Sequence, residues 1–298
     1  MKSLYFFLLS LVLGLSWSCS KKTSSEKTKP LIVVSVSPYD SFIKKISGDF
    51  FNVQAAVPPN FNSHLFEPTP SQIQGFDQAV MWFGISEPFE KKLLLSLKSH
   101  NPNLIAVDLS VTPHHDKNVH SHQIGTQGCN HHDHDHEGED RHYWTDPIIA
   151  LKQCGMILKA LNDRFPEKKE MFERNYQTLK KEFLSLDQAC KSILASVKGS
   201  AIIISHPSLG YFCERYDLVQ LALECEGKTP LPEDLTKILQ FSKQHPVRCV
   251  FAVEQFDNRG AISVSDYLKL PVYTINTNAP GYFENFKNIA NDIAKGKI

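Results

Sequence analysis

Short apolar runs alternate with amphipathic segments along most of the chain beyond residue 30. In the first half, four apolar runs predict buried strands: Leu31–Val36, Val53–Val57, Ala79–Phe83 and Leu104–Val107. The segments between them predict helices: Asp40–Ser47, Pro70–Phe76 and Glu87–Leu97. Strands that alternate with helices favour a parallel sheet with helical crossovers. Residues 31–145 are therefore expected to form an α/β lobe.

A long helical stretch follows this lobe. Asp146–Phe165 has a helical pattern, and in Glu167–Val197 apolar side chains recur at spacings of three and four, as in an amphipathic helix. Pro166 interrupts the pattern between the two segments. Residues 146–197 are predicted to form a rigid helical connector, and a pair of ordinary helices is the alternative.

The alternating pattern returns after the connector. Four apolar runs predict strands: Ala201–Ser205, Val219–Leu223, Cys249–Val253 and Val272–Ile275. Four further segments predict helices: Pro207–Tyr216, Pro232–Gln244, Arg259–Leu268 and Glu284–Ala294. Residues 198–298 are thus expected to form a second lobe. The predicted fold class is α/β, with two lobes that have parallel-sheet cores and are joined by a long rigid helix.

The amino terminus carries a short apolar segment. Leu4–Leu15 is about twelve residues long, which is too short to span a bilayer as a helix but suits the core of a signal peptide. The residues around Cys19 resemble a bacterial lipobox. We expect residues 1–18 to be a signal peptide and residues 19–30 a polar tether with lipid on Cys19, and ordinary cleaved secretion is the alternative. A lipid there would hold the protein at the extracytoplasmic face of a membrane.

Six further cysteines leave the redox state open. An exported chain can pair them in bridges, but six cysteines allow many connectivities and their spacing selects none. Buried free thiols are an equally good interpretation. We expect one bridge within the last third of the chain.

The charge balance excludes some classes of protein. The 298 residues include 32 lysines and arginines and 32 aspartates and glutamates, so the formal net charge is zero. Binding to nucleic acid is therefore not expected, because no basic excess exists to neutralise phosphates. Hydrophobic residues make up 42% of the chain, which argues against global disorder. The unusual feature is the 13 histidines, of which eight lie within residues 114–136.

Three other histidines occur beside predicted strands and helices. His64 lies in the loop after the strand predicted at Val53–Val57, and His206 directly follows the one predicted at Ala201–Ser205. Ligands of open α/β sheets bind beyond the carboxyl ends of strands, so both residues lie where a cleft would open. His142 stands just before the predicted connector. Neutral imidazoles are typical zinc ligands, so these three predict a metal site in a cleft between the lobes.

Three segments carry a resemblance to a known family: residues 58–70, 141–147 and 206–216. In this order, with a long helix after the second, they resemble the zinc-specific solute-binding proteins of bacterial ABC importers, also called the ZnuA-like or cluster A-I family. The resemblance implies that His64, His142 and His206 are ligands of a transported Zn2+. It also implies a monomer without enzymatic activity that delivers zinc to an ABC permease with its ATPase.

The fourth ligand is the point at which this chain departs from the family. Many members supply a carboxylate from the second lobe, near the strand predicted at Val272–Ile275, where this sequence has Asn276. Either an oxygen of Asn276 or a water molecule would complete the tetrahedron. We expect Glu67 to orient His64 or its loop without touching the metal.

The histidine cluster is interleaved with acidic residues and lies directly before His142. Its members are His114, His115, His120, His122, His131, His132, His134 and His136. A solvated charged loop is a poor explanation for eight imidazoles. The resemblance implies a mobile accessory site of lower affinity that gathers or senses zinc.

Two other functions stay open. A manganese- or iron-binding relative of the same fold is one, although family members that favour manganese tend to carry glutamate where this chain has His206. A secreted zinc hydrolase is the other, because three histidines and a water also describe catalytic zinc. Glu67 is the sole nearby general base in the sequence, and no His-Glu-x-x-His motif occurs. Zinc capture is therefore the predicted function.

Overall fold

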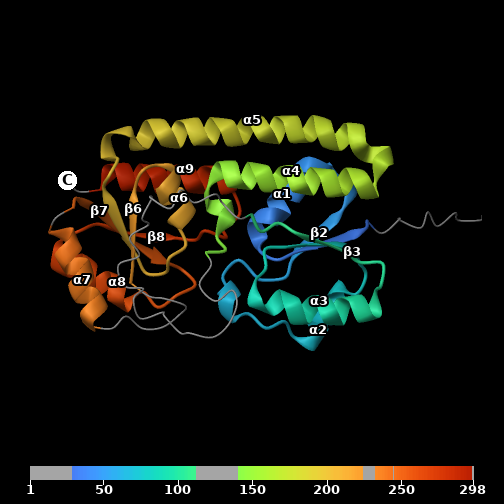
Figure 1. Cartoon of the computed structure of the whole chain (residues 1–298), viewed down its shortest axis with the longest axis horizontal. Coiled ribbons are helices and arrows are strands. Elements are labelled where there is room, and N and C mark those ends of the chain that lie inside the picture. The colour runs from blue at the N-terminus through green and yellow to red at the C-terminus, as the bar shows by residue number, and fades with distance from the viewer. Residues whose placement is uncertain (1–28, 112–139, 224–231, 244, 297–298) are drawn as a thin grey trace, which may run out of the picture.

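The computed structural model describes residues 29–111, 140–223, 232–243 and 245–296. Within these ranges the chain forms two α/β lobes, and one long helix, α5 (Lys169–Leu194), runs across both of them (Figure 1). The predicted signal peptide, Cys19 and the clustered histidines lie outside the described residues, so those expectations stay predictions.

The first lobe is built on a parallel sheet with strand order β2-β1-β3-β4. The strands are β1 (Leu31–Val34), β2 (Asn52–Ala55), β3 (Ala79–Gly84) and β4 (Ile105–Asp108). The helices are α1 (Ser37–Ser47), α2 (Pro70–Phe76) and α3 (Pro88–His100). The central strands β1 and β3 are almost wholly buried, which explains their continuous apolar runs. The helix predicted from Asp40 begins at Ser37 because Pro38 suits its first turn.

The second lobe repeats this arrangement with strand order β6-β5-β7-β8, again parallel throughout. The strands are β5 (Ala201–Ile204), β6 (Val219–Ala222), β7 (Val247–Val253) and β8 (Val272–Ile275). The helices are α6 (Gly210–Arg215), α7 (Pro232–Ser242), α8 (Arg259–Leu268) and α9 (Tyr282–Lys295). The prediction of two parallel-sheet lobes is confirmed.

Two long helices connect the lobes. Asp146 caps α4 (Pro147–Arg164), because its carboxylate accepts hydrogen bonds from the first backbone N–H groups of that helix. The chain breaks at Pro166, as predicted, and continues as α5 (Lys169–Leu194). This helix packs against α4, against α1 of the first lobe and against α9 of the second lobe (Figure 1). The long connecting helix is therefore confirmed, and it contacts both lobes.

Three buried aromatic rings join α5 to the two lobes. Phe183 of α5 lies with its ring centroid 5.3 Å from Phe42 of α1 and 5.4 Å from Tyr282 of α9. Phe42 and Tyr282 are 5.0 Å apart, so every ring contacts the other two. Edge-to-face pairs of this kind contribute about 0.5–1.5 kcal/mol each beyond the burial of their area. The cluster therefore fixes both lobes to one helix.

A polar contact joins α5 to α6. Arg215 Nε donates to Asp187 Oδ1 at 2.6 Å and lies 3.4 Å from Asp146 Oδ1, while Lys191 Nζ lies 2.9 Å from Asp187 Oδ2. Burial would raise the pKa of Asp187, but hydrogen bonds from Arg215 and Lys191 outweigh it and lower that pKa. The Asp187 carboxylate is thus stabilised in its charged form between the connector and the second lobe.

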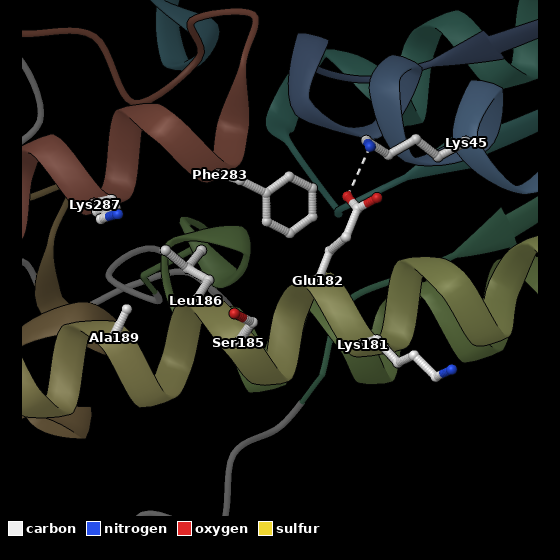
Figure 2. Close-up of a pocket in the computed structure, with 8 residues that line it drawn as sticks. All are labelled: Lys45, Lys181, Glu182, Ser185, Leu186, Ala189, Phe283 and Lys287. Atoms are coloured by element: carbon white, nitrogen blue, oxygen red, sulfur yellow. Dashed lines mark hydrogen bonds and ion pairs between the residues drawn. The ribbon is translucent and has the colours of Figure 1, made fainter.

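An open hollow of about 620 Å³ lies where α1, α5 and α9 meet (Figure 2). Lys45 and Glu182 form an ion pair of 2.7 Å on one side, and the ring of Phe283 projects from α9 on the other. Lys45 Nζ also lies 5.2 Å from the centroid of that ring. None of the three candidate histidines lines the hollow, so it is not the predicted metal site.

Among the described residues, no helix is long and apolar enough to cross a membrane. Cys154, Cys190, Cys213 and Cys249 are buried free thiols. The bridge expected in the last third is wrong for the described residues, because Cys213 and Cys249 are unpaired there. Both thiols are held in the apolar interior, and burial raises their pKa.

Candidate metal centre

His64, His142 and His206 come together between the two lobes. One ring nitrogen from each lies within 4.8 Å of the other two, and the ring centroids are 5.1 to 5.2 Å apart. His64 belongs to the first lobe, His206 follows β5 of the second lobe, and His142 precedes α4. The three residues predicted from the sequence are therefore placed so that one metal ion could contact all of them.

The loop that carries His64 is defined by local caps. His64 lies in a short 3₁₀ helix, Ser63–Leu65, whose cap Asn62 accepts from the His64 backbone N–H at 2.9 Å. The loop then ends at Thr69, which caps α2 through a reciprocal contact with Gln72. Both ends of the segment are thus set by hydrogen bonds that the sequence encodes locally.

Glu87 fixes the orientation of the His64 ring. This buried carboxylate lies with Oε2 3.2 Å from His64 Nδ1, and its Oε1 accepts from Ser63 Oγ at 2.8 Å. A carboxylate that remains ionised can only accept, so Nδ1 carries a proton, and in the neutral imidazole Nε2 then keeps its lone pair. His64 Nε2 lies 3.2 Å from His206 Nε2. The tautomer set by Glu87 therefore directs Nε2 toward the other histidines.

The contact between Glu87 and His64 also shifts the pKa of both groups. Burial would raise the pKa of Glu87, but the hydrogen bond and charge of His64 outweigh it and lower that pKa. Burial would lower the pKa of His64, and here too Glu87 outweighs it and raises that pKa. Glu87 is therefore ionised near neutral pH, which is the state that accepts the Nδ1 proton.

Asp140 orients His142 in the same way. Its Oδ1 lies 2.7 Å from His142 Nδ1 and also accepts from the His142 backbone N–H at 2.9 Å. The backbone oxygen of Asp140 accepts from Tyr211 Oη at 2.7 Å. A Cβ on Gly210 would lie 2.6 Å from Asp140 Oδ2, so only glycine leaves room for this carboxylate beside α6. Asp140 thus links His142 to the second lobe.

His206 is held by a stacking contact. Its ring is parallel to that of Phe256, with centroids 3.7 Å apart and an interplanar angle of 8°, and the residue is 2% exposed. Burial, followed by the charges of His142 and His64, lowers the pKa of His206 well below its ordinary value. Its imidazole is therefore neutral, which is the form that binds metals.

Two other expectations concern the side chains around the site. Glu67, expected to orient His64 or its loop, is exposed, and the carboxylate that contacts His64 is Glu87. The side-chain oxygen of Asn276 accepts from the Asn278 backbone N–H at 2.8 Å, and its nitrogen lies 2.9 Å from a Glu254 oxygen. One of the two lone pairs of the Asn276 side-chain oxygen is thus used within the second lobe.

The sequence patterns did not identify Glu87, Asp140 or Phe256. Asp140 had a local signal, since it stands two residues before His142 in the acidic end of the histidine cluster. Glu87 stands at the start of a helix and 23 residues from the histidine that it orients, so only the folded loop brings them together. Phe256 lies beyond β7 and meets His206 through sheet pairing.

Two lobes on a shared long helix, with convergent histidines between them, define a two-lobed solute-binding protein with a candidate metal site. Residues 32–296 match the family described as ZnuA, zinc-uptake complex component A, periplasmic. The match spans most of the chain, which therefore belongs to this family.

The names of individual relatives describe metal binding but do not agree on zinc. A protein of Chlamydia trachomatis serovar D whose name describes metal binding is 26% identical over 291 residues, 97% of this chain and 98% of the relative. The manganese ABC transporter substrate-binding lipoprotein PsaA of Streptococcus mitis is 23% identical, covering 91% and 87% of the two chains. A crystal structure of ZnuA matches with a TM-score of 0.76 at 27% identity, covering 90% and 98%. Membership of the family thus leaves the ion to be argued from the site.

Proposed function

We propose that this chain is an extracytoplasmic solute-binding protein that captures Zn2+ and delivers it to an ABC permease with its ATPase. The observation that carries the proposal is the convergence of three imidazoles, one nitrogen from each within 4.8 Å of the others. Two of these rings have Nδ1 bound to a carboxylate, which leaves Nε2 for a metal. The third is neutral because it is buried.

Zinc suits this donor set better than manganese. Among the described residues, the cluster that could hold an ion contains histidines alone, without a carboxylate. Imidazole nitrogens bind zinc well, whereas manganese prefers hard carboxylate oxygen, and the general order of affinities also places zinc above manganese. Copper and nickel accept three imidazoles too, so a direct competition is needed. A water molecule would serve as fourth ligand.

We also propose how the protein reaches the membrane surface and how it collects zinc. Residues 1–18 would direct export, and lipid on Cys19 would keep the protein at the membrane surface beside its permease. The histidines of residues 114–136 would gather zinc at lower affinity before it reaches the interlobe site. We infer a monomer, because both lobes that supply ligands belong to one chain.

A hydrolytic function has less support. A zinc hydrolase needs a general base beside the metal-bound water, and Glu67 is exposed. The buried Glu87 accepts hydrogen bonds from Ser63 and His64 and so serves to orient a ligand. We therefore propose that the chain is not an enzyme.

Calorimetric titration of zinc tests the proposal. The triple variant His64→Ala, His142→Ala, His206→Ala should lose tight binding, whereas His100→Ala, an exposed histidine on α3, is the matched control and should keep it. Deletion of residues 114–136 should leave one tight site. Tight binding unchanged in the triple variant would refute the assignment, and preference for Mn2+ at limiting chelator would favour the manganese alternative.

A further inference from the structure

The loop that carries His64 is bound to the second lobe by two amide side chains. Gln255 Nε2 donates to the backbone oxygen of Pro59 at 2.7 Å. Asn276 Nδ2 lies 3.4 Å from the same oxygen and 3.4 Å from Asn60 Oδ1. Gln255 follows β7 and Asn276 follows β8, two neighbouring strands of one sheet. The carboxyl ends of these strands therefore hold the loop in place across the cleft.

The partners of Asn276 determine which way its amide faces. Its Oδ1 accepts from the Asn278 backbone N–H at 2.8 Å, and a backbone N–H can only donate. Its Nδ2 donates to Glu254 Oε2 at 2.9 Å, and an ionised carboxylate can only accept. The residue is 9% exposed, and its own backbone oxygen accepts from Asn285 of α9 at 2.9 Å. The oxygen of the amide is thus used within the second lobe.

The neighbour Glu254 explains why an amide suits this position. An aspartate at residue 276 would place a carboxylate oxygen at hydrogen-bond distance from Glu254, where two like charges repel. It would also lose the N–H groups that face Pro59 and Asn60. Asparagine offers two N–H donors to these three oxygens and carries no charge.

We propose that Gln255 and Asn276 form a clasp that holds the His64 loop against the second lobe, and that Asn276 is a positioning residue and not the fourth metal ligand. This inference rests on the proposed zinc site, since the clasp acts by keeping His64 beside His142 and His206. A metal bound to all three residues loses one imidazole ligand when the His64 loop moves away from the second lobe. Breaking the clasp therefore speeds zinc release without changing the ligands.

The first test measures zinc release by stopped flow, with an excess of a chromogenic chelator, from the full mature chain. Gln255→Ala removes the shortest bond of the clasp and should release zinc about two- to tenfold faster, as expected for one neutral hydrogen bond. Gln177→Ala, an exposed glutamine of α5, is the matched control and should release at the wild-type rate. An unchanged rate in a folded Gln255→Ala protein overturns the clasp.

The second test separates a positioning role from a ligand. The Co2+-loaded Asn276→Ala variant should show the visible absorption spectrum of the wild type, because the coordinating atoms are the same, yet should release metal faster. Asn276→Asp should also weaken zinc binding, through repulsion from Glu254. A changed Co2+ spectrum in Asn276→Ala, or tighter zinc binding in Asn276→Asp, identifies residue 276 as a ligand and overturns the inference.

The two proposals fail in different ways. If the wild-type chain shows no tight zinc site, the proposed function is wrong. If the wild type binds zinc tightly while the clasp variants release it at the wild-type rate, the function stands and the clasp alone is refuted. Thermal denaturation of each metal-free variant checks that it is folded. The variant Gln255→Glu, whose side chain has a similar size but no N–H donor, should also release zinc faster in the first test.

Discussion

Removing the Glu87 carboxylate tests the idea that this residue sets the tautomer of His64. In Glu87→Ala, His64 Nδ1 loses its acceptor at 3.2 Å and Ser63 Oγ loses one at 2.8 Å. A hydrogen bond to a charged group is worth about 1.5–3 kcal/mol, and loss of a residue that orients a metal-bound histidine typically lowers metal affinity about 10- to 100-fold. We therefore expect a zinc affinity about 10- to 100-fold lower than that of the wild type.

The conservative variant Glu87→Gln separates the part of this affinity loss that comes from the orientation of His64 from the part that comes from the lost charge. Glutamine can present its oxygen to His64 Nδ1 and its amide to Ser63, whose hydroxyl can accept as well as donate. The tautomer should then survive while the charge is lost, so the affinity should fall by less, up to about tenfold. Nitrogen NMR of the imidazole should show the proton on Nδ1 of His64 in the wild type and in Glu87→Gln.

Competition with a chromophoric chelator measures the affinities. Glu67→Ala is the control, because Glu67 is exposed in the same loop and was the residue expected from the sequence to orient His64. It should bind zinc as tightly as the wild type. An affinity within about threefold of wild type in Glu87→Ala, or a loss in Glu67→Ala alone, would refute the role that the structure gives to Glu87.

Three further outcomes are expected. Gly210→Ala should weaken zinc binding in a chelator competition, because its Cβ would lie 2.6 Å from Asp140 Oδ2, whereas Gly75→Ala, with open space around it, should not. Phe183→Ala should lower the free energy of unfolding in urea by about 3–5 kcal/mol. Asp187→Asn should lower it by about 1–3 kcal/mol at pH 7. Because the folded pKa of Asp187 is lowered, that contribution is present above the unfolded pKa and disappears as pH falls through the folded one, so denaturation at acid pH should show a smaller difference.

Patterns local in sequence predicted most of the fold. The buried strands of both sheets carry apolar runs that the parallel, doubly covered sheet requires, and Pro166 marks the break between the connector helices. The helix predicted from Pro207 begins only at Gly210, where the chain beyond His206 has turned. Helix ends are set by such turns, which periodicity does not encode.

Some residues of the candidate site could likewise be predicted from local sequence patterns, and others could not. His64 and His206 could be placed from the sequence because each follows a strand, and the carboxyl ends of strands border the cleft. Glu87 could not be placed beside His64 from the sequence, because its contact with His64 depends on the path of a loop between two strands. Glu67 is nearer to His64 in sequence, yet it is exposed. Nearness along a loop is thus a poor guide to which carboxylate orients a ligand.

The contacts between the lobes limit how the site can open. On α5, Phe183 packs against both lobes at once, so a wide hinge motion would expose three buried rings. At the cleft, the hydrogen bond from Gln255 to Pro59 involves only one short loop of the first lobe. Moving that loop removes His64 from the other two histidines and leaves the aromatic contacts of α5 with both lobes in place. Entry and release of the metal are therefore expected to depend on the His64 loop, with the lobes tilting only slightly, and metal-free and metal-bound crystal structures would show which part moves.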